Sequence, residues 1–207
     1  TNQGLADELG INPSASITCV KPSGTVSQLV DSASGIHTRH SPYYIRTIRS
    51  DVKDPLCNLL IDSGVPHEPD ITNPSNVMVF SFPMRSPKYS LTRKDLSAIG
   101  QLELHSTYSK FWAEHKVSQT ISVKEDEWIN VGSYVFDNFD DISGVSFLPY
   151  SDYVYKQAPY TECTKQEFDI LNKSIPEIDW SNLLKYETLD STSGSQELAC
   201  TAGGCEI

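Results

Sequence analysis

The stretch Ile-Thr-Cys-Val-Lys-Pro-Ser-Gly-Thr-Val-Ser-Gln-Leu-Val, residues 17–30, decides the fold class of this 207-residue chain. Its first four residues are a short apolar run with a β-branched bias, which favours a strand. A Pro-Ser-Gly turn follows at 22–24, and residues 25–30 continue as a short helix. A strand that passes through a tight turn into a helix is typical of α/β proteins.

Strands and helices are predicted to alternate on both sides of this stretch. The pair Thr92 and Asp95 resembles a helix-capping box, as does the pair Thr164 and Glu167. Pro83 is expected to end the strand predicted at 77–82. This alternation predicts an α/β fold with parallel strand pairing, and residues 144–148 are expected to be a buried strand. We expect the strands at 43–48, 77–82, 120–123 and 144–148, and the helices at 5–9, 55–63, 91–116, 124–139 and from 164 onward.

The composition changes near residue 187. Residues 1–186 carry the periodic segments, whereas residues 187–207 are small and polar before they end in Cys-Thr-Ala-Gly-Gly-Cys-Glu-Ile. We therefore expect one folded segment over 1–186 and a flexible tail over 187–207.

Composition excludes several classes of protein. Hydrophobic residues make up 38% of the chain, which is too many for a disordered protein, and the net charge of −11 disfavours a general nucleic-acid binder. No apolar run is long enough for a membrane span, and no signal-peptide pattern opens the chain. Five scattered cysteines do not suggest a secreted disulfide framework, so we expect a cytoplasmic protein.

Residues 21–27 could bind a phosphate. A loop that enters a helix presents unpaired backbone N–H groups, Gly24 allows an anion to approach closely, and the hydroxyls of Ser23, Thr25 and Ser27 can donate hydrogen bonds. The alternative is that these hydroxyls are ordinary helix caps.

The terminal pair Cys200 and Cys205 could be a redox dithiol. Gly203 and Gly204 let the intervening backbone fold back so that a disulfide can close, and about fifteen preceding flexible residues give a reach on the order of 20 Å. Such a pair could pass its redox state to another site by thiol–disulfide exchange. Two idle exposed cysteines are the alternative, and no second ligand pair supports zinc.

A basic block follows the loop. His37, Arg39, His40, Arg46 and Arg49 could line an anionic site, or they could belong to a polar loop and a strand whose arginines pair with carboxylates. Metal binding is not expected from them. The other three cysteines, Cys19, Cys57 and Cys163, are expected to be buried small hydrophobic residues. The tyrosine-rich stretch near residues 150–160 is expected to pack in a core or an interface.

Three blocks of the sequence resemble the class II, adenosylcobalamin-dependent ribonucleotide reductases, and in particular their triphosphate-reducing type. The first is Cys-Val-Lys-Pro-Ser-Gly-Thr-Val-Ser at 19–27, continued by Ser-Gly-Ile-His-Thr-Arg-His-Ser-Pro-Tyr-Tyr-Ile-Arg at 34–46. The second block covers residues 144–163, and the third is the C-terminal Cys-x₄-Cys. Thr38 departs from the pattern, since relatives often carry proline there.

The resemblance implies that the chain is the C-terminal part of a ten-stranded α/β barrel with a flexible tail. It implies that Cys200 and Cys205 re-reduce an active-site disulfide and are themselves reduced by thioredoxin. In the family, a thiyl radical formed with adenosylcobalamin abstracts the 3′ hydrogen, the 2′ hydroxyl leaves as water, and two cysteines are oxidised. The resemblance assigns the phosphates of a ribonucleoside triphosphate to a loop that corresponds to Pro22, Ser23, Gly24, Thr25, Val26 and Ser27.

Nothing in the sequence matches the family's radical cysteine or its barrel cysteine pair. We therefore expect this chain to be inactive alone and to need the upstream portion of the reductase as a partner, with the complete enzyme holding most of the cofactor. The alternative is a free-standing nucleotide-binding or thiol redox-carrier module. A free module is expected to be a stable monomer, whereas a barrel segment with open strand edges is expected to aggregate or to need a partner.

Overall fold

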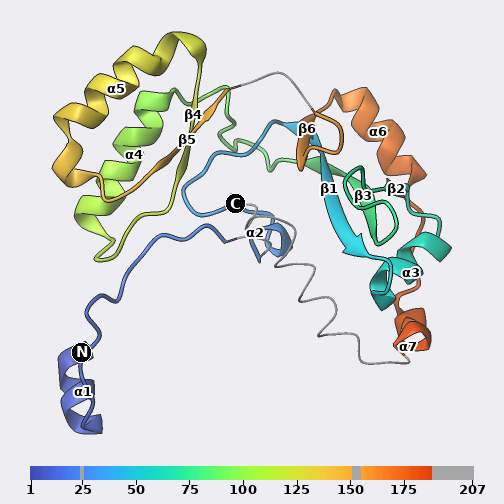
Figure 1. The fold of residues 1–207 in the computed structure, drawn as a ribbon, viewed down its shortest axis with the longest axis horizontal. Helices are drawn as coiled ribbons and strands as arrows, with labels where there is room; N and C mark the ends of the chain where they lie inside the picture. Colours follow the sequence, from blue (N-terminus) through green and yellow to red (C-terminus); the bar gives the residue numbers. More distant parts are fainter. Residues whose placement is uncertain (24–25, 151–154, 188–207) are drawn as a thin grey trace. The chain divides into compact units, whose positions relative to one another are not determined.

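The computed structural model describes residues 1–23, 26–150 and 155–187. The chain divides into two compact units (Figure 1). The first consists of Thr1–Arg39 and Leu91–Ser151, and the second of His40–Ser90 and Asp152–Ile207. Each unit is described by itself.

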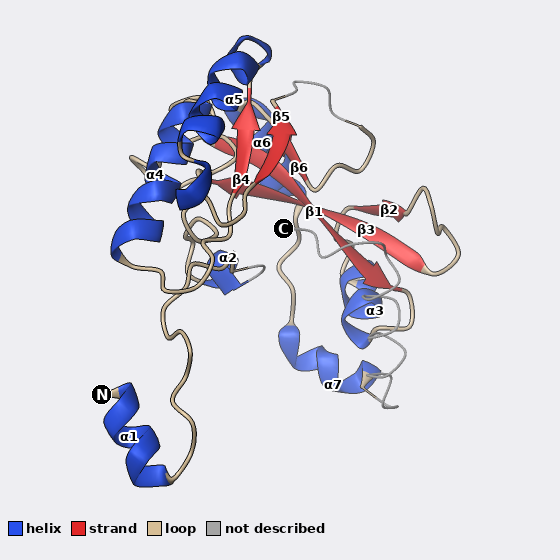
Figure 2. Cartoon of the chain, turned by 60° about the vertical axis from the view of Figure 1, so that its left-hand side comes forward, coloured by secondary structure: helices blue, strands red, loops and turns tan. Residues whose placement is uncertain are grey.

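The first unit is built on two parallel strands. Strand β4 (Thr120–Val123) pairs with β5 (Ser146–Pro149), in register from Thr120 opposite Ser146 to Val123 opposite Pro149. Helices α4 (Ala98–Phe111) and α5 (Trp128–Asp137) lie along this strand pair (Figures 1 and 2). The unit also contains α1 (Asn2–Leu9), α2 (Val26–Leu29) and the 3₁₀ turns Glu125–Glu127 and Phe139–Asp141.

The core of the first unit lies between these helices and strands. Its fully buried side chains alternate along β4 and recur at helical spacing on α4, which is the pattern of one covered sheet face. They are Ala98, Leu102, Ile121, Val123 and Val131.

Helix α4 begins later than the sequence pattern predicted. Thr92 N–H donates to Asp95 Oδ2 over 2.8 Å, yet this pair forms a turn, and Ser97 is the true cap, accepting from Gly100 N–H. The reason is long-range: the Arg39 amide donates to Leu91 O and the Arg93 amide donates to Arg39 O, which holds residues 91–93 in an extended bridge. The start of the predicted helix at residue 91 is therefore wrong.

Strand β5 is also less covered than expected. Three of its four residues are exposed, including Leu148, so the expectation of a buried strand is wrong for the described chain. Within the described residues β5 pairs only with β4, which leaves its other edge open.

The second unit contains an antiparallel sheet of four strands in the order β2-β3-β1-β6. The expectation of parallel pairing therefore holds for the first unit and is wrong for the second. Its strands are β1 (Tyr43–Asp51), β2 (His67–Pro69), β3 (Val77–Arg85) and β6 (Tyr160–Glu162), and its helices are α3 (Pro55–Asp62), α6 (Lys165–Ser174) and α7 (Leu183–Tyr186), with a 3₁₀ turn at Trp180–Asn182.

Pro83 lies inside β3, opposite Ile45, and does not end the strand. Among the described residues β2 pairs only as far as Phe80, so β3 has a free edge there at Pro83, where a missing N–H costs no ladder hydrogen bond. The predicted end of this strand is thus wrong by three residues.

One face of the antiparallel sheet is covered by α3 and by residues that follow α6. Met78, Phe80 and Phe82 alternate along β3 and so share this face. The buried cluster that they join contains Cys57, Leu60 and Val65, with Ile61, Ile175 and Ile178 packed against it.

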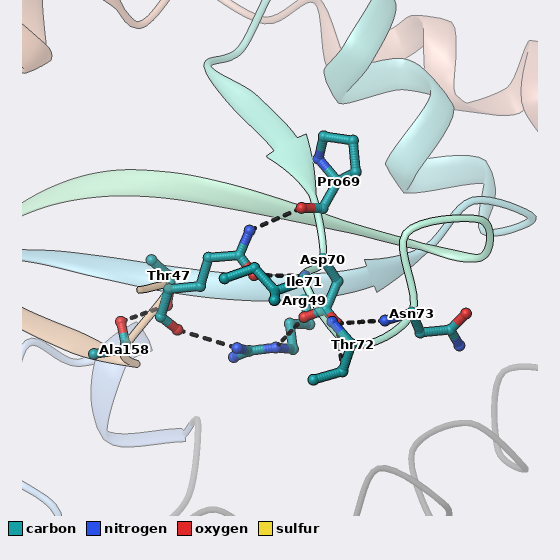
Figure 3. Close-up of polar contacts among 9 residues, drawn as sticks. Thr47, Arg49, Pro69, Asp70, Ile71, Thr72, Asn73 and Ala158 are labelled. Carbon is teal, nitrogen blue, oxygen red and sulfur yellow. Dashed lines mark hydrogen bonds and ion pairs between the residues drawn. The ribbon is translucent and has the colours of Figure 1, made fainter. Parts of the chain in front are cut away.

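A polar network ties three segments of the second unit together (Figure 3). Arg49 Nε on β1 contacts Asp70 Oδ2 over 2.8 Å, and Arg49 Nη2 donates to the Gln157 carbonyl over 3.0 Å. The Gln157 side chain donates to Pro69 O and accepts from Ile71 N–H. Gln157 has a φ of +59°, and this network holds it in that strained conformation against β1.

Candidate functional site

The loop at residues 21–27 follows a single bridging residue, Val20, which pairs with the segment that leads into β4. Val20 forms a parallel bridge with Val117, and the Ser118 amide donates to Val20 O over 2.9 Å. The predicted strand at 17–20 is thus reduced to one bridging residue, and the predicted helix after the loop is α2. Gly24 and Thr25 lie outside the described residues.

Ser23 is held by the segment that returns after α2. Its N–H donates to Ser34 Oγ over 2.9 Å, and the two hydroxyl oxygens lie 3.3 Å apart. The Ser23 carbonyl in turn accepts from Val26 N–H over 3.1 Å, which begins the first turn of α2. The start of the loop therefore has a fixed backbone.

Ser27 is buried, with 3% of its surface exposed. Its Oγ has no hydrogen-bond partner within the described residues, and neither has Oε1 of the adjacent Gln28. A buried hydroxyl without a partner is uncommon and needs an explanation such as a bound water or ligand. The loop thus has an unsatisfied donor where the sequence analysis expected one. Pro22 is partly buried, whereas Val26 is exposed.

A second loop packs directly against the first. Gly35 has a φ of +55°, and a Cβ added there would lie 3.0 Å from Lys21 O and 3.5 Å from Pro22 N. Only glycine allows both this backbone conformation and this approach. No local signal in the sequence points to this role of Gly35, because its contact with Lys21 joins positions that lie fourteen residues apart along the chain.

Three residues of the basic block have partners within their own unit. His37 uses both ring nitrogens inside the first unit, contacting Ser34 O and Thr120 N–H, and the buried guanidinium of Arg39 pairs with Asp31. Arg49 pairs with Asp70 in the second unit. For these three residues the alternative of a polar loop and a strand with paired arginines is the better description.

The three cysteines of the folded segment differ from one another. Cys57 is fully buried as expected, and burial raises the pKa of its thiol; Cys163 is partly buried, and burial raises its pKa as well. Cys19 is exposed, so the expectation of burial is wrong there. Cys200 and Cys205 lie outside the described residues.

The described residues contain no group of three or more His, Cys, Asp or Glu side chains that could hold a metal ion. In the same part of the chain, no helix has both the length and the apolar character needed to cross a membrane.

Comparison with known proteins gives consistent results, although no model of a known family matches the chain. A solved class II, B12-dependent ribonucleotide reductase aligns with a TM-score of 0.76 and 26% identity, over 90% of this chain and 26% of that one. The fold described above is therefore that of part of a class II ribonucleotide reductase.

The sequence relatives are more specific. A probable adenosylcobalamin-dependent ribonucleoside-triphosphate reductase of Dictyostelium discoideum is 35% identical over 213 residues, which cover 100% of this chain and 27% of the relative. The corresponding reductase of Euglena gracilis is 31% identical over 97% of this chain and 28% of its own length. The chain is thus homologous to a portion of the adenosylcobalamin-dependent ribonucleoside-triphosphate reductases, and it spans little more than a quarter of their length.

Proposed function

We propose that this chain is the C-terminal portion of an adenosylcobalamin-dependent ribonucleoside-triphosphate reductase, an enzyme that makes deoxyribonucleotides. The observation that carries the proposal is the 35% identity to the Dictyostelium protein over the whole of this chain. The solved class II reductase, which aligns over 90% of the chain, supports it from the fold. We further propose that the chain is inactive alone and completes its barrel with the upstream portion.

In this proposal the loop from Pro22 to Ser27 holds the phosphates of the substrate. Three observations support it: the fixed backbone at Ser23, the unsatisfied Ser27 hydroxyl, and the close backbone approach that Gly35 permits. A loop whose ends are already held by hydrogen bonds loses less conformational freedom when an anion binds. The substrate class is a ribonucleoside triphosphate, as the names of the relatives indicate.

Adenosylcobalamin would supply the radical that starts the reaction. We assign none of its contacts to residues of this chain, and we expect the upstream portion to hold most of it.

The C-terminal cysteines complete the proposal, although they lie outside the described residues. In each turnover the reduced Cys200 and Cys205 would attack the oxidised active-site disulfide, restoring two thiols there and forming a Cys200–Cys205 disulfide. Thioredoxin, or a similar dithiol, would then reduce that disulfide and become oxidised itself.

The phosphate assignment is tested by making Ser23→Leu and Thr25→Leu in the reductase reassembled from this chain and the upstream portion. Both changes should raise the KM for the ribonucleoside triphosphate about tenfold or more, since hydroxyl donors and space are lost together. Ser133→Leu, at an exposed serine of α5, is the control. An unchanged KM in both loop variants would remove the assignment.

The dithiol is tested with Cys200→Ser and Cys205→Ser together. Turnover driven by thioredoxin should be lost, while turnover driven by a small dithiol that enters the active site should remain. Equal rates with either reductant, at the level of the unmodified protein, would show that the pair carries no electrons.

A further inference from the structure

The segment from Asp31 to Arg39 returns along the phosphate loop and contacts it at both ends. At the start of the loop, Ser34 Oγ accepts from the Ser23 N–H, and Gly35 packs against Lys21 and Pro22. At the end of the loop, Ser32 N–H donates to Ser27 O over 2.9 Å and closes the last turn of α2. Whatever holds this segment therefore also holds the loop.

His37 links the segment to the sheet. Its Nδ1 lies 2.6 Å from Ser34 O, and its Nε2 lies 2.9 Å from the backbone nitrogen of Thr120, the first residue of β4. A backbone N–H can only donate and a carbonyl can only accept, so Nε2 accepts from Thr120 and Nδ1 donates to Ser34. One side chain thus connects β4 to the carbonyl of the residue that binds Ser23.

Arg39 holds the other end. Only 5% of the residue is exposed, and its guanidinium donates to Ser32 O over 2.6 Å and to Asp31 Oδ1 over 2.9 Å. Its own backbone is fixed on both sides, by Leu91 O and by Arg93 N–H. The planar fork of arginine reaches two acceptors at once, which lysine cannot reproduce.

We propose that His37 and Arg39 are the positioning residues of the phosphate loop: His37 sets its start relative to β4, and Arg39 sets the end of α2. Neither residue contacts substrate in this account. The inference rests on the proposed function, because it gives the loop the substrate phosphates as its ligand. It goes beyond that function in assigning roles to two residues outside the loop.

The test uses the reductase reassembled from this chain and the upstream portion. In His37→Asn the amide nitrogen can keep the contact with Ser34, and in His37→Gln the amide oxygen can keep the contact with Thr120; His37→Ala loses both. We expect the KM for the ribonucleoside triphosphate to rise about threefold in each single-contact variant and about tenfold in His37→Ala. Because a displaced loop weakens ground-state and transition-state binding alike, kcat should change little.

In Arg39→Lys the KM should rise about as much as in the single-contact variants, because lysine keeps the charge but cannot donate to two acceptors at once in the geometry of a guanidinium group. Inorganic tripolyphosphate should act as a competitive inhibitor, and its inhibition constant should rise in the variants in the same order as the KM. This inhibitor reports on phosphate binding without the base or the ribose. The controls are His115→Asn and Arg85→Lys, at exposed positions of the first and second units.

A direct readout of the loop is amide hydrogen exchange at Ser23, whose N–H donates to Ser34. Exchange should accelerate in His37→Ala and in Ser34→Ala. If His37→Ala does not fold, the two amide variants and Ser34→Ala decide the question.

The outcomes separate this inference from the proposed function. A raised KM in Ser23→Leu and Thr25→Leu, with an unchanged KM in every His37 and Arg39 variant, would overturn the positioning roles alone. An unchanged KM in the loop variants as well would overturn the phosphate assignment and the inference with it. A fall in kcat with a constant KM would also contradict positioning of the phosphate loop.

Discussion

Nε of Arg49 lies 2.8 Å from Oδ2 of Asp70, and this ion pair joins strand β1 to the turn between β2 and β3. Asp70 Oδ1 accepts from the amides of Thr72 and Asn73 over 2.8 and 2.9 Å and from the Thr72 hydroxyl. One buried carboxylate therefore organises the turn and, through Arg49, the residue Gln157 that packs on β1.

Asp70→Asn should destabilise the second unit by about 2 to 3 kcal/mol, because the amide can neither accept every hydrogen bond nor neutralise Arg49. The measurement is the free energy of unfolding in urea, with hydrogen exchange of peptides from β1 and β3 as the probe of the second unit. Asp169→Asn, an exposed acid on α6, is the matched control and should be nearly neutral. Equal stability of the two variants would mean that the hydrogen-bond network around Asp70 does not contribute to the stability of the second unit.

The same carboxylate predicts a pH dependence in strongly acidic solution. The Thr72 hydroxyl, the Arg49 guanidinium and the backbone N–H groups lower the pKa of Asp70 to about 2. A group whose pKa is lowered by folding stabilises the folded state above its unfolded pKa, and this contribution disappears as the pH falls through the folded pKa. The free energy of unfolding should therefore fall by about 2 kcal/mol between roughly pH 4 and pH 2. This fall should be absent in Asp70→Asn.

His105 predicts a second pH dependence, in weakly acidic solution. The residue is fully buried on α4, neither ring nitrogen has a hydrogen-bond partner among the described residues, and burial lowers its pKa, which the nearby Gln119 side chain partly offsets. The unfolded chain binds a proton near pH 6.5 and the folded chain only at lower pH, so the free energy of unfolding should fall by up to about 1.4 kcal/mol per pH unit between these two values.

This effect is checked by measuring the free energy of unfolding from pH 7.5 to 5. His105→Gln should flatten the dependence, whereas His115→Asn, at an exposed position, should retain it. A dependence that is identical in all three proteins would assign it to other groups.

Two glycines of the first unit should respond to alanine in opposite directions. Gly35→Ala places a Cβ 3.0 Å from Lys21 O at a φ of +55°, so it should destabilise the unit by about 1 to 2 kcal/mol. Gly132 lies in α5 with open space around its Cβ position, so Gly132→Ala should stabilise the helix by about 0.5 to 1 kcal/mol. Thermal unfolding of both variants is the check, and a stabilising Gly35→Ala would contradict the close packing of the two loops.

Local signals in the sequence predicted much of the fold. The limits of β4 match the predicted strand at 120–123, where polar and apolar residues alternate, and the Thr164–Glu167 capping box begins α6 where expected. The stop of α1 at Gly10 is likewise a local effect, since Gly10 adopts a left-handed conformation. In each case the physical cause lies within a few residues of its effect.

The remaining features depend on distant partners. The pattern from residue 91 is helical, yet the bridge between Arg39 and Thr92 keeps its first residues extended. The antiparallel sheet depends on the register of β1 against β3, which no short window of sequence contains. The site divides in the same way. The sequence predicted the loop at 21–27, whereas the contact of Ser34 with this loop and the link from His37 to β4 required the fold.

The most direct test of the account is formation of deoxynucleotide from a ribonucleoside triphosphate, adenosylcobalamin and a dithiol, using this chain, the upstream portion of the reductase, and the two mixed. Product is expected only from the mixture, because the proposal assigns the phosphate loop and the terminal dithiol to this chain and the radical machinery to the upstream portion. Full activity of the upstream portion without this chain would contradict it.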